Sequence, residues 1–252
     1  MKKVRILGIE SSCDETSVSV IERSTGGKVK ILSNIVKSQL TVHKNFGGVV
    51  PELAARAHSE IIDEIILMAL KKAKIKFEDL NAIAATSGPG LLGGLLVGVV
   101  AAKTLSSVLN IPFIAINHLE GHALSVHLEK EIEYPYLLLL VSGGHTEFTI
   151  INKFNSYKRI GTTLDDALGE AFDKTARLLN LGYPGGPEIE KYAKKGNKNR
   201  FKLPKPILKK GGCNMSFAGL KTAILKISKF IKKDDDKKDL AASFQKTIQE
   251  IL

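Results

Sequence analysis

The chain contains the stretch Ile114-Ala115-Ile116-Asn117-His118-Leu119-Glu120-Gly121-His122. Its opening is a short apolar run typical of a buried strand, and its second half begins a predicted helix. His118 and His122 are four residues apart, so both imidazoles would lie on one helix face, about 5–6 Å apart at Cβ. Because ligands of open α/β sheets bind at the carboxyl ends of strands, this position favours a shared metal ion. A pair of surface or capping histidines is the alternative.

The composition describes a chain that is long enough for two domains and strongly basic. Its 252 residues are many for a single core. A net charge of +11 favours a polyanionic partner, with nucleic acid as the first candidate and solubility alone as the alternative. Lysines are dense in the second half, at Lys191, Lys194, Lys195, Lys198, Lys202, Lys205, Lys209 and Lys210.

The N-terminus and the cysteines indicate a cytoplasmic protein. Glu10 and Asp14 follow the basic opening too closely for the apolar core of a signal peptide. No apolar run reaches the ~18–20 residues that a membrane span needs, since residues 88–102 are interrupted by glycines. Cys13 and Cys213 make no disulfide framework and suit a reducing compartment. We therefore expect no membrane association.

A pattern of strand, polar turn, strand, strand and helix occurs twice, starting near residues 4 and 136. The first copy has predicted strands at Arg5–Ile9, Ser17–Ile21 and Val29–Val36. The second has them at Tyr136–Val141, Glu147–Asn152 and Tyr157–Gly161. This duplication predicts two similar α/β domains, residues 1–130 and 131–252, which face each other across a cleft.

The polar turns carry the candidate chemistry. Glycines beside hydroxyl side chains suit phosphate oxygens, as at Ser142-Gly143-Gly144 and again at residues 183–187. Together with the acidic pair Asp14 and Glu15, to which we assign a catalytic role, they favour a nucleotide cleft. Neither a Walker motif nor a G-x-G-x-x-G follows the first strand, which argues against P-loop and dinucleotide-binding proteins. Turns whose glycines serve only the backbone are the alternative.

Seven segments together resemble one protein family. They are residues 9–16 (IESSCDET), 50–58 (VPELAARAH), 88–90 (GPG), 117–122 (NHLEGH), 140–146 (LVSGGHT), 169–174 (GEAFDK) and 217–221 (FAGLK). Over essentially its whole length the chain is similar to the TsaD family, the tRNA N6-adenosine threonylcarbamoyltransferases. That family has the RNase H-like fold of the actin, sugar-kinase and Hsp70 superfamily, so the resemblance implies two duplicated lobes.

The resemblance also implies an activity and its residues. The family transfers a threonylcarbamoyl group from threonylcarbamoyl-AMP to N6 of adenosine 37, in tRNAs reading codons that begin with A. By resemblance, His118 and His122 bind one divalent metal ion, with Fe²⁺ expected and Zn²⁺ or Mg²⁺ as alternatives. The substrate-binding positions carried over are Val141, Ser142, Gly143, Gly144, His145, Asp173, Gly186 and, as a weaker match, Glu190. The implied partners are tRNA, a smaller paralogue of the same fold (TsaB) and an ATPase (TsaE). Asp173 pairing with Lys174 or Arg177 and His145 capping a turn are the structural alternatives.

The C-terminal end departs from the family pattern. The chain stops at Leu252 within a predicted amphipathic helix, without a cap. Family members continue further and carry there an Asn that contacts the adenylate and an Asp that completes the metal site. We therefore expect a C-terminally truncated second lobe that leaves Ile248, Ile251 and Leu252 uncovered. Made alone, such a chain is predicted to aggregate and to lack transferase activity.

Two other functions compete with the transferase. A metalloprotease shares the H-x-x-x-H spacing, but its catalytic Glu directly follows the first His, where this chain has Leu119. A kinase-like phosphotransferase or a non-catalytic scaffold of the same fold is the other rival. Such kinases need an acidic base and no histidine pair.

Overall fold

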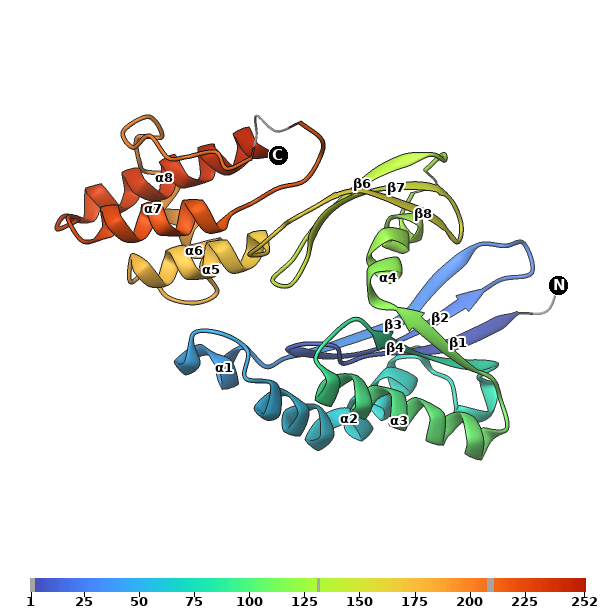
Figure 1. Ribbon diagram of the computed structural model, residues 1–252. Coiled ribbons are helices and arrows are strands. Elements are labelled where there is room, and N and C mark those ends of the chain that lie inside the picture. Colours follow the sequence, from blue (N-terminus) through green and yellow to red (C-terminus); the bar gives the residue numbers. More distant parts are fainter. Residues whose placement is uncertain (1–2, 131, 208–210) are drawn as a thin grey trace. The chain divides into compact units, whose positions relative to one another are not determined.

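The computed structural model describes residues 3–130, 132–207 and 211–252, and this part of the chain is mixed α/β (Figure 1). That architecture confirms the predicted fold class at this level. The chain divides into two compact units, Met1–Glu131 and Ile132–Leu252. Each unit has its own sheet and its own hydrophobic core.

The first unit is built on a five-stranded sheet of order β3-β2-β1-β4-β5. Its strands are β1 (Val4–Glu10), β2 (Glu15–Arg23), β3 (Val29–Ser38), β4 (Ala82–Gly88) and β5 (Phe113–Asn117). The first three form an antiparallel meander, whereas β4 runs parallel to β1 and β5 runs parallel to β4. The carboxyl ends of β1, β4 and β5 therefore meet at one edge of the sheet.

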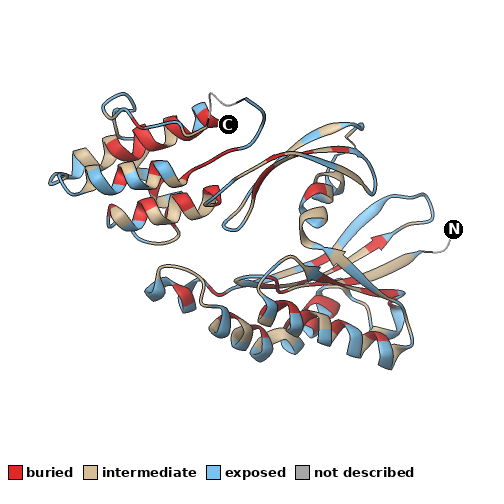
Figure 2. Ribbon diagram, in the orientation of Figure 1, coloured by how far each residue is buried: buried red, intermediate tan, exposed pale blue. Residues whose placement is uncertain are grey.

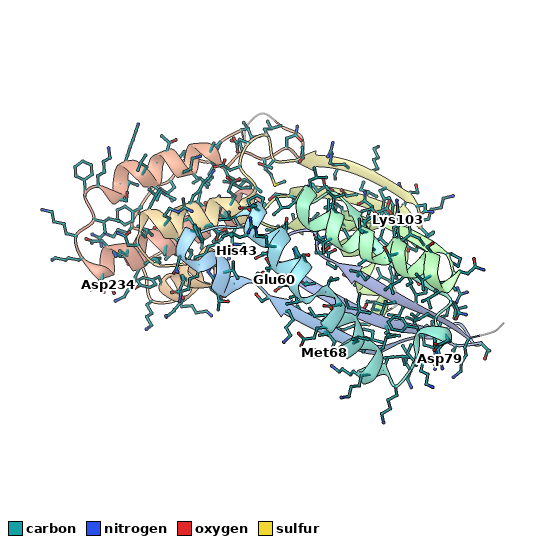
Figure 3. The ribbon with its side chains drawn as sticks, turned by 90° about the horizontal axis from the view of Figure 1, so that it is seen from below. His43, Glu60, Met68, Asp79, Lys103 and Asp234 are labelled. Atoms are coloured by element: carbon teal, nitrogen blue, oxygen red, sulfur yellow. The ribbon has the colours of Figure 1, made fainter. Side chains whose placement is uncertain are left out.

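Two long helices pack against this sheet and against each other. The helices of the unit are α1 (Leu40–His43), α2 (Pro51–Ala73), α3 (Leu92–Leu109) and α4 (His118–Leu124), with short 3₁₀ turns at Lys44–Phe46, Phe77–Asp79 and Ser125–Leu128. Figure 3 shows Met68 on α2 and Lys103 on α3. Helix α2 starts at Pro51, where a missing N–H has no cost in the first turn. Its buried face joins the alternating buried residues of the sheet, such as Val18 and Val20, in one core.

Helix α3 corrects one expectation. Its 18 residues have a mean hydropathy of 1.8, so by length and composition alone the helix could cross a membrane. The glycines that suggested an interruption lie inside the helix instead. A Cβ on Gly94 would clash with the carbonyl oxygen of Ser11, and one on Gly98 with the Ser11 hydroxyl. These glycines let α3 approach the residue that follows the first strand closely.

The second unit combines a small sheet with a group of helices. Its strands β6 (Tyr136–Val141), β7 (Thr146–Lys153) and β8 (Ser156–Thr162) form an antiparallel meander of order β6-β7-β8. Its helices are α5 (Leu168–Leu178), α6 (Gly185–Ala193), α7 (Ala218–Ser228) and α8 (Asp234–Ile251). The meander repeats that of β1, β2 and β3, but no counterpart of β4 and β5 follows among the described residues of this unit. The full duplication of the lobes stays a prediction.

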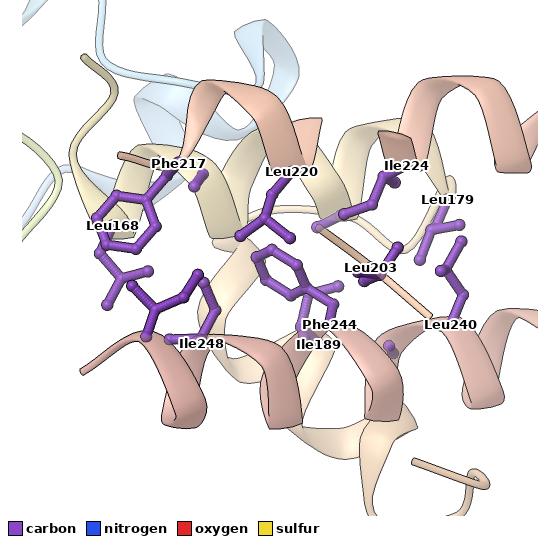
Figure 4. Close-up of a cluster of buried hydrophobic side chains, with 14 of the residues drawn as sticks. Leu168, Leu179, Ile189, Leu203, Phe217, Leu220, Ile224, Leu240, Phe244 and Ile248 are labelled. Atoms are coloured by element: carbon purple, nitrogen blue, oxygen red, sulfur yellow. The ribbon is translucent and has the colours of Figure 1, made fainter. Parts of the chain in front are cut away.

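The C-terminal helix is a core element of the second unit. Figure 2 shows a buried face along α8, and Figure 4 shows Phe244 and Ile248 among buried side chains from the neighbouring helices. Ile248 is 4% exposed and Ile251 is 8% exposed, whereas Leu252 is 42% exposed. The expectation that Ile248 and Ile251 are uncovered is wrong, because α5, α6 and α7 supply a core that α8 closes. Burial of Ile248 and Ile251 thus removes most of the exposed stripe on which the predicted aggregation depended, and the aggregation itself stays a prediction.

Candidate functional site

The two histidines of the first unit converge on one point. Asn117 ends β5 and caps α4, since its side-chain Oδ1 accepts the N–H of Leu119 at 2.9 Å and that of Glu120 at 3.2 Å. The cap makes His118 the first residue of the helix. Nε2 of His118 and Nε2 of His122 are 3.2 Å apart, with the rings nearly perpendicular at 79°. Two imidazole nitrogens that bind one ion at about 2.0–2.1 Å also lie about 3 Å apart, so the pair fits the prediction of shared ligation.

A partly buried carboxylate contacts the first histidine. Glu10 ends β1, and its Oε2 is 3.3 Å from Nδ1 of His118. Its Oε1 accepts the N–H of Ser12 at 2.6 Å, and Thr86 donates its hydroxyl to Oε2. Burial alone would raise the pKa of Glu10, but the hydrogen bonds from His118, Ser12 and Thr86 lower it to about 2. The carboxylate is therefore ionised at neutral pH.

The acidic pair lies at the turn between β1 and β2. Asp14 is partly buried, and Glu15 begins β2 with an exposed side chain. The carbonyl oxygen of Asp14 accepts the N–H of Gln39 at 3.0 Å, which ties this turn to the segment after β3. Asp14 thus ends the turn that follows Glu10 and Glu15 begins the next strand, both at the same sheet edge as the histidine pair. No third His, Cys, Asp or Glu completes a metal-binding group among residues 3–130, 132–207 and 211–252.

A buried network of histidines supports this turn from within. Nδ1 of His58 is 2.7 Å from the hydroxyl of Thr16 and 3.1 Å from Nε2 of Gln39. On the opposite side of the ring, Nε2 of His58 donates to the carbonyl oxygen of Cys13 at 3.1 Å. Gln39 extends this hydrogen-bond network to the fully buried His43, whose Nε2 is 3.1 Å from Oε1 of Gln39. This arrangement is satisfied when His58 is neutral, and burial lowers the pKa of His58.

The first unit is therefore expected to lose stability when the pH falls from 7.5 to 5. The unfolded chain binds a proton at His58 near its ordinary pKa of about 6.5, whereas the folded chain resists that proton, so unfolding takes it up. The slope for one proton is at most about 1.4 kcal/mol per pH unit. Urea unfolding at several pH values measures it. The variant His58→Gln should start less stable but show a smaller slope in this window, and an unchanged slope would contradict the assignment.

The glycine turn of the second unit is held together by its own serine. The hydroxyl of Ser142 accepts the N–H of His145 at 2.9 Å and that of Gly144 at 3.3 Å, and the N–H of Ser142 donates to the carbonyl of His145 at 2.8 Å. His145 thus closes the turn through its backbone. Val141, which ends β6 before the turn, is 44% exposed. A Cβ on Gly143 or Gly144 would meet nothing within 4 Å, so this side of the turn faces open space.

The remaining predicted substrate residues lie on α5 and α6. Asp173 accepts the N–H of Gly185 at 2.7 Å and so holds the start of α6. Its neighbour Lys174 pairs with Asp166 at 3.0 Å and with Glu170 at 2.6 Å. Gly186 has open space at its Cβ position, and the exposed Glu190 pairs with Lys194 at 2.7 Å. The structure thus brings Asp173 beside the glycine turn of residues 183–187, whereas Glu190 lies further along the helix.

Known proteins match this chain over most of its length. The sequence profile of TsaD, tRNA N6-adenosine threonylcarbamoyltransferase, matches residues 30–252. The chain belongs to the TsaD family. A relative of that name from Pelagibacter ubique (strain HTCC1062) is 64% identical over 251 residues, which cover 100% of this chain and 70% of the relative. One from Bartonella henselae is 57% identical and covers 99% of this chain and 69% of the relative.

Solved structures give weaker matches. YeaZ from Pseudomonas aeruginosa has a TM-score of 0.42 and 14% sequence identity, covering 62% of this chain and 66% of its own. The Ppx/GppA family member from Aquifex aeolicus has a TM-score of 0.40 and 13% identity, covering 99% of this chain and 91% of its own.

In this TsaD family member, two acidic residues of the second unit hold its helices in place without a signal in the sequence. Asp165 accepts hydrogen bonds from the hydroxyl of Ser216 at 2.5 Å and from the N–H of Phe217 at 2.8 Å. These contacts hold the start of α7 in place. Asp166 lies between Lys174 and Lys221, at 3.0 and 2.9 Å. Burial alone would raise the pKa of both carboxyls, but the hydrogen bonds from these partners outweigh it and lower both pKa values below their ordinary value. The segments 169–174 and 217–221 singled out the two lysines, but nothing local in the sequence indicated their acidic partner.

Proposed function

We propose that this chain transfers a threonylcarbamoyl group from threonylcarbamoyl-AMP to N6 of adenosine 37, in tRNAs that read codons beginning with A. Membership of the TsaD family and the names of its relatives support this activity. The observation that carries it in the structure is the convergence of the two Nε2 atoms at the edge of the sheet, 3.2 Å apart and backed by a carboxylate.

His118 and His122 are proposed to hold one divalent ion through Nε2, with Fe²⁺ first and Zn²⁺ or Mg²⁺ as alternatives. When bound, such an ion supplies positive charge that polarises a carbonyl or phosphoryl oxygen. The chain's own residues provide the remainder of the reaction. The N6 amine attacks the carbamoyl carbon, a C–N bond forms, the C–O bond to the phosphate breaks, and AMP leaves. We assign Asp14 and Glu15 the removal of the N6 proton, because they lie at the turn after Glu10 at the same sheet edge.

The substrate-binding role of the second unit rests on its open glycine positions. We assign the adenylate phosphate to the turn of Ser142, Gly143 and Gly144 and a ribose hydroxyl to Asp173, with Val141, His145, Gly186 and Glu190 lining the same ligand. The hydroxyl of Ser142 already occupies two backbone N–H groups, so a phosphate oxygen would share them with it. The two-lobed fold of the actin superfamily is part of this proposal, and the meander that the two units share supports it.

The variant Gly143→Val is expected to weaken binding of the adenylate at least about 10-fold while leaving the fold intact. The added side chain meets no protein atom within 4 Å of its Cβ, so it fills only the space assigned to the ligand. Calorimetry with threonylcarbamoyl-AMP or AMP measures the loss. Gly26→Val, in the exposed turn between β2 and β3, is the matched control and should bind as the wild type does. Equal affinity of the Gly143 variant would remove the phosphate from this turn.

We propose tRNA, TsaB and TsaE as partners and the cytoplasm as the location. A positive net charge of +11 suits a tRNA substrate. Helix α2 buries Ile65 and Ile66 but leaves Leu67 57% exposed, and α3 exposes Leu92 and Leu96, so both helices offer outward apolar side chains to a paralogue. Reconstitution of the protein, in the form in which the cell makes it, with tRNA, threonine, bicarbonate, ATP and the adenylate-forming enzyme tests the function. Mass spectrometry of the nucleosides should then show the modified adenosine.

The rival functions have less support. The residue after the first histidine is Leu119, so the general base of a zinc peptidase is missing from its position. A sugar kinase needs no convergent imidazoles. Release of ADP that depends on a sugar, without modified adenosine, would favour the kinase.

A further inference from the structure

We infer that Glu10 is a positioning residue that selects the tautomer of His118 by accepting its Nδ1–H, which leaves the lone pair of Nε2 for a metal ion. This inference rests on the proposed metal-binding role of His118 and His122. Glu10 lies 108 positions before His118 in the chain and ends a different strand.

The polar contacts of Glu10 leave it only the role of an acceptor. The N–H of Ser12 donates to Oε1 at 2.6 Å, and the hydroxyl of Thr86 donates to Oε2. Nδ1 of His118 lies 3.3 Å from the same Oε2. Both oxygens of Glu10 thus already act as acceptors, so the hydrogen of this third contact comes from the imidazole. A neutral imidazole with its proton on Nδ1 has its lone pair on Nε2.

The other neighbours of the ring agree with this tautomer. The hydroxyl of Ser12 is 3.4 Å from Nδ1 and can donate or accept, so it does not decide the tautomer. Nε2 of His122 lies 3.2 Å from Nε2 of His118, and a hydrogen bond of this length needs one proton and one lone pair. With its own proton on Nδ1, His118 supplies the lone pair. A divalent ion would take the place of that proton.

The amide variant Glu10→Gln separates this role from a purely structural one. The N–H of Ser12 requires an oxygen at the position of Oε1, so the amide NH₂ must lie at the position of Oε2. There it faces Nδ1 of His118 as a donor, while the hydroxyl of Thr86 can rotate to accept. Nδ1 would then become the acceptor and Nε2 would carry the proton. An amide in place of a carboxylate beside a catalytic histidine selects the wrong tautomer in the same way.

Two readouts test the inference. In protein with ¹⁵N-labelled histidine and no metal, long-range ¹H–¹⁵N spectra report which nitrogen of His118 is protonated. Calorimetric titration with Zn²⁺ alone reports the affinity of the pair. For Glu10→Gln we expect the proton to move to Nε2 and Zn²⁺ to bind about 10–100-fold more weakly than to the wild type, the range typical of outer-sphere partners. The matched control Glu22→Gln removes a carboxylate of the neighbouring strand that pairs with Arg5 at 2.9 Å, and it should change neither readout.

The variant Glu10→Ala makes the test decisive. It removes the acceptor without offering a donor, so both tautomers are accessible and Zn²⁺ should bind more tightly to it than to Glu10→Gln. A structural role predicts the opposite order, because the amide preserves shape and the alanine does not. That order, or a Glu10→Gln protein with Nδ1 still protonated, would overturn the inference. Inversion of the tautomer in a protein whose wild type binds no Zn²⁺ would uphold the role of Glu10 and remove the proposed metal site instead.

Discussion

His118→Ala and His122→Ala should each lose the bound divalent ion and at least about 100-fold of the transfer rate, while the thermal unfolding of the protein stays close to that of the wild type. Replacing a residue that binds the metal directly should reduce the rate more than replacing an outer-sphere partner, which typically costs about 10–100-fold. The His118 side chain is partly exposed and that of His122 is exposed, so the fold should change little when either is truncated. Elemental analysis of the purified variants and the rate of adenosine modification give the two readouts.

His127→Ala is the matched control for these variants. His127 lies in the 3₁₀ turn Ser125–Leu128 that follows α4, within the same stretch of chain. Its replacement should leave metal content and rate near those of the wild type. Full activity of a metal-free His118→Ala/His122→Ala double variant would show that the histidine pair has no part in the reaction.

Phe244→Ala should lower the free energy of unfolding of the second unit by about 3–5 kcal/mol, the range for a large buried aromatic residue. Phe244 has no exposed surface, and its ring meets that of Phe172 edge to face at a centroid distance of 5.0 Å. The side chain lies on α8 in the centre of the core formed with α5, α6 and α7 (Figure 4). Its removal leaves a cavity that the surrounding helices cannot fill without losing their own contacts.

Urea unfolding of the second unit, set beside the control Phe230→Ala, measures this effect. Phe230 follows α7 and is 81% exposed, so its loss should change stability by less than about 0.5 kcal/mol. Similar small effects for the two variants would mean that α8 does not close the core. That result would restore the expectation of an uncovered C-terminal stripe.

The parts of the fold that depend on local pattern could be predicted from the sequence. Strand β6 has the predicted bounds Tyr136–Val141, because an apolar run bounded by a polar glycine turn leaves few alternatives. The four-residue spacing of His118 and His122 likewise predicts that both side chains lie on one helix face. Both features depend on neighbours in the chain rather than on how distant segments pair.

Features that depend on distant pairing could not be predicted. Glu10 reaches His118 only because β4 pairs in parallel with both β1 and β5, which brings three strand ends to one edge. The burial of Ile248 depends on helices contributed by residues 168–228, and no periodicity within α8 reveals it. The glycines of α3 indicated an interruption in the sequence, although Gly94 provides room for the backbone of Ser11. In each case the deciding partner is far away in the chain.

The most direct test of the proposed transferase is a single-turnover reaction of the protein with threonylcarbamoyl-AMP and two tRNAs that differ only at position 37. One tRNA carries adenosine there and the other guanosine. Nucleoside mass spectrometry should find one threonylcarbamoyl group on the adenosine tRNA, none on the guanosine tRNA, and none on either when His118 and His122 are both alanine. Equal labelling of the two tRNAs, or full labelling by the double variant, would contradict the proposed function and its histidine site.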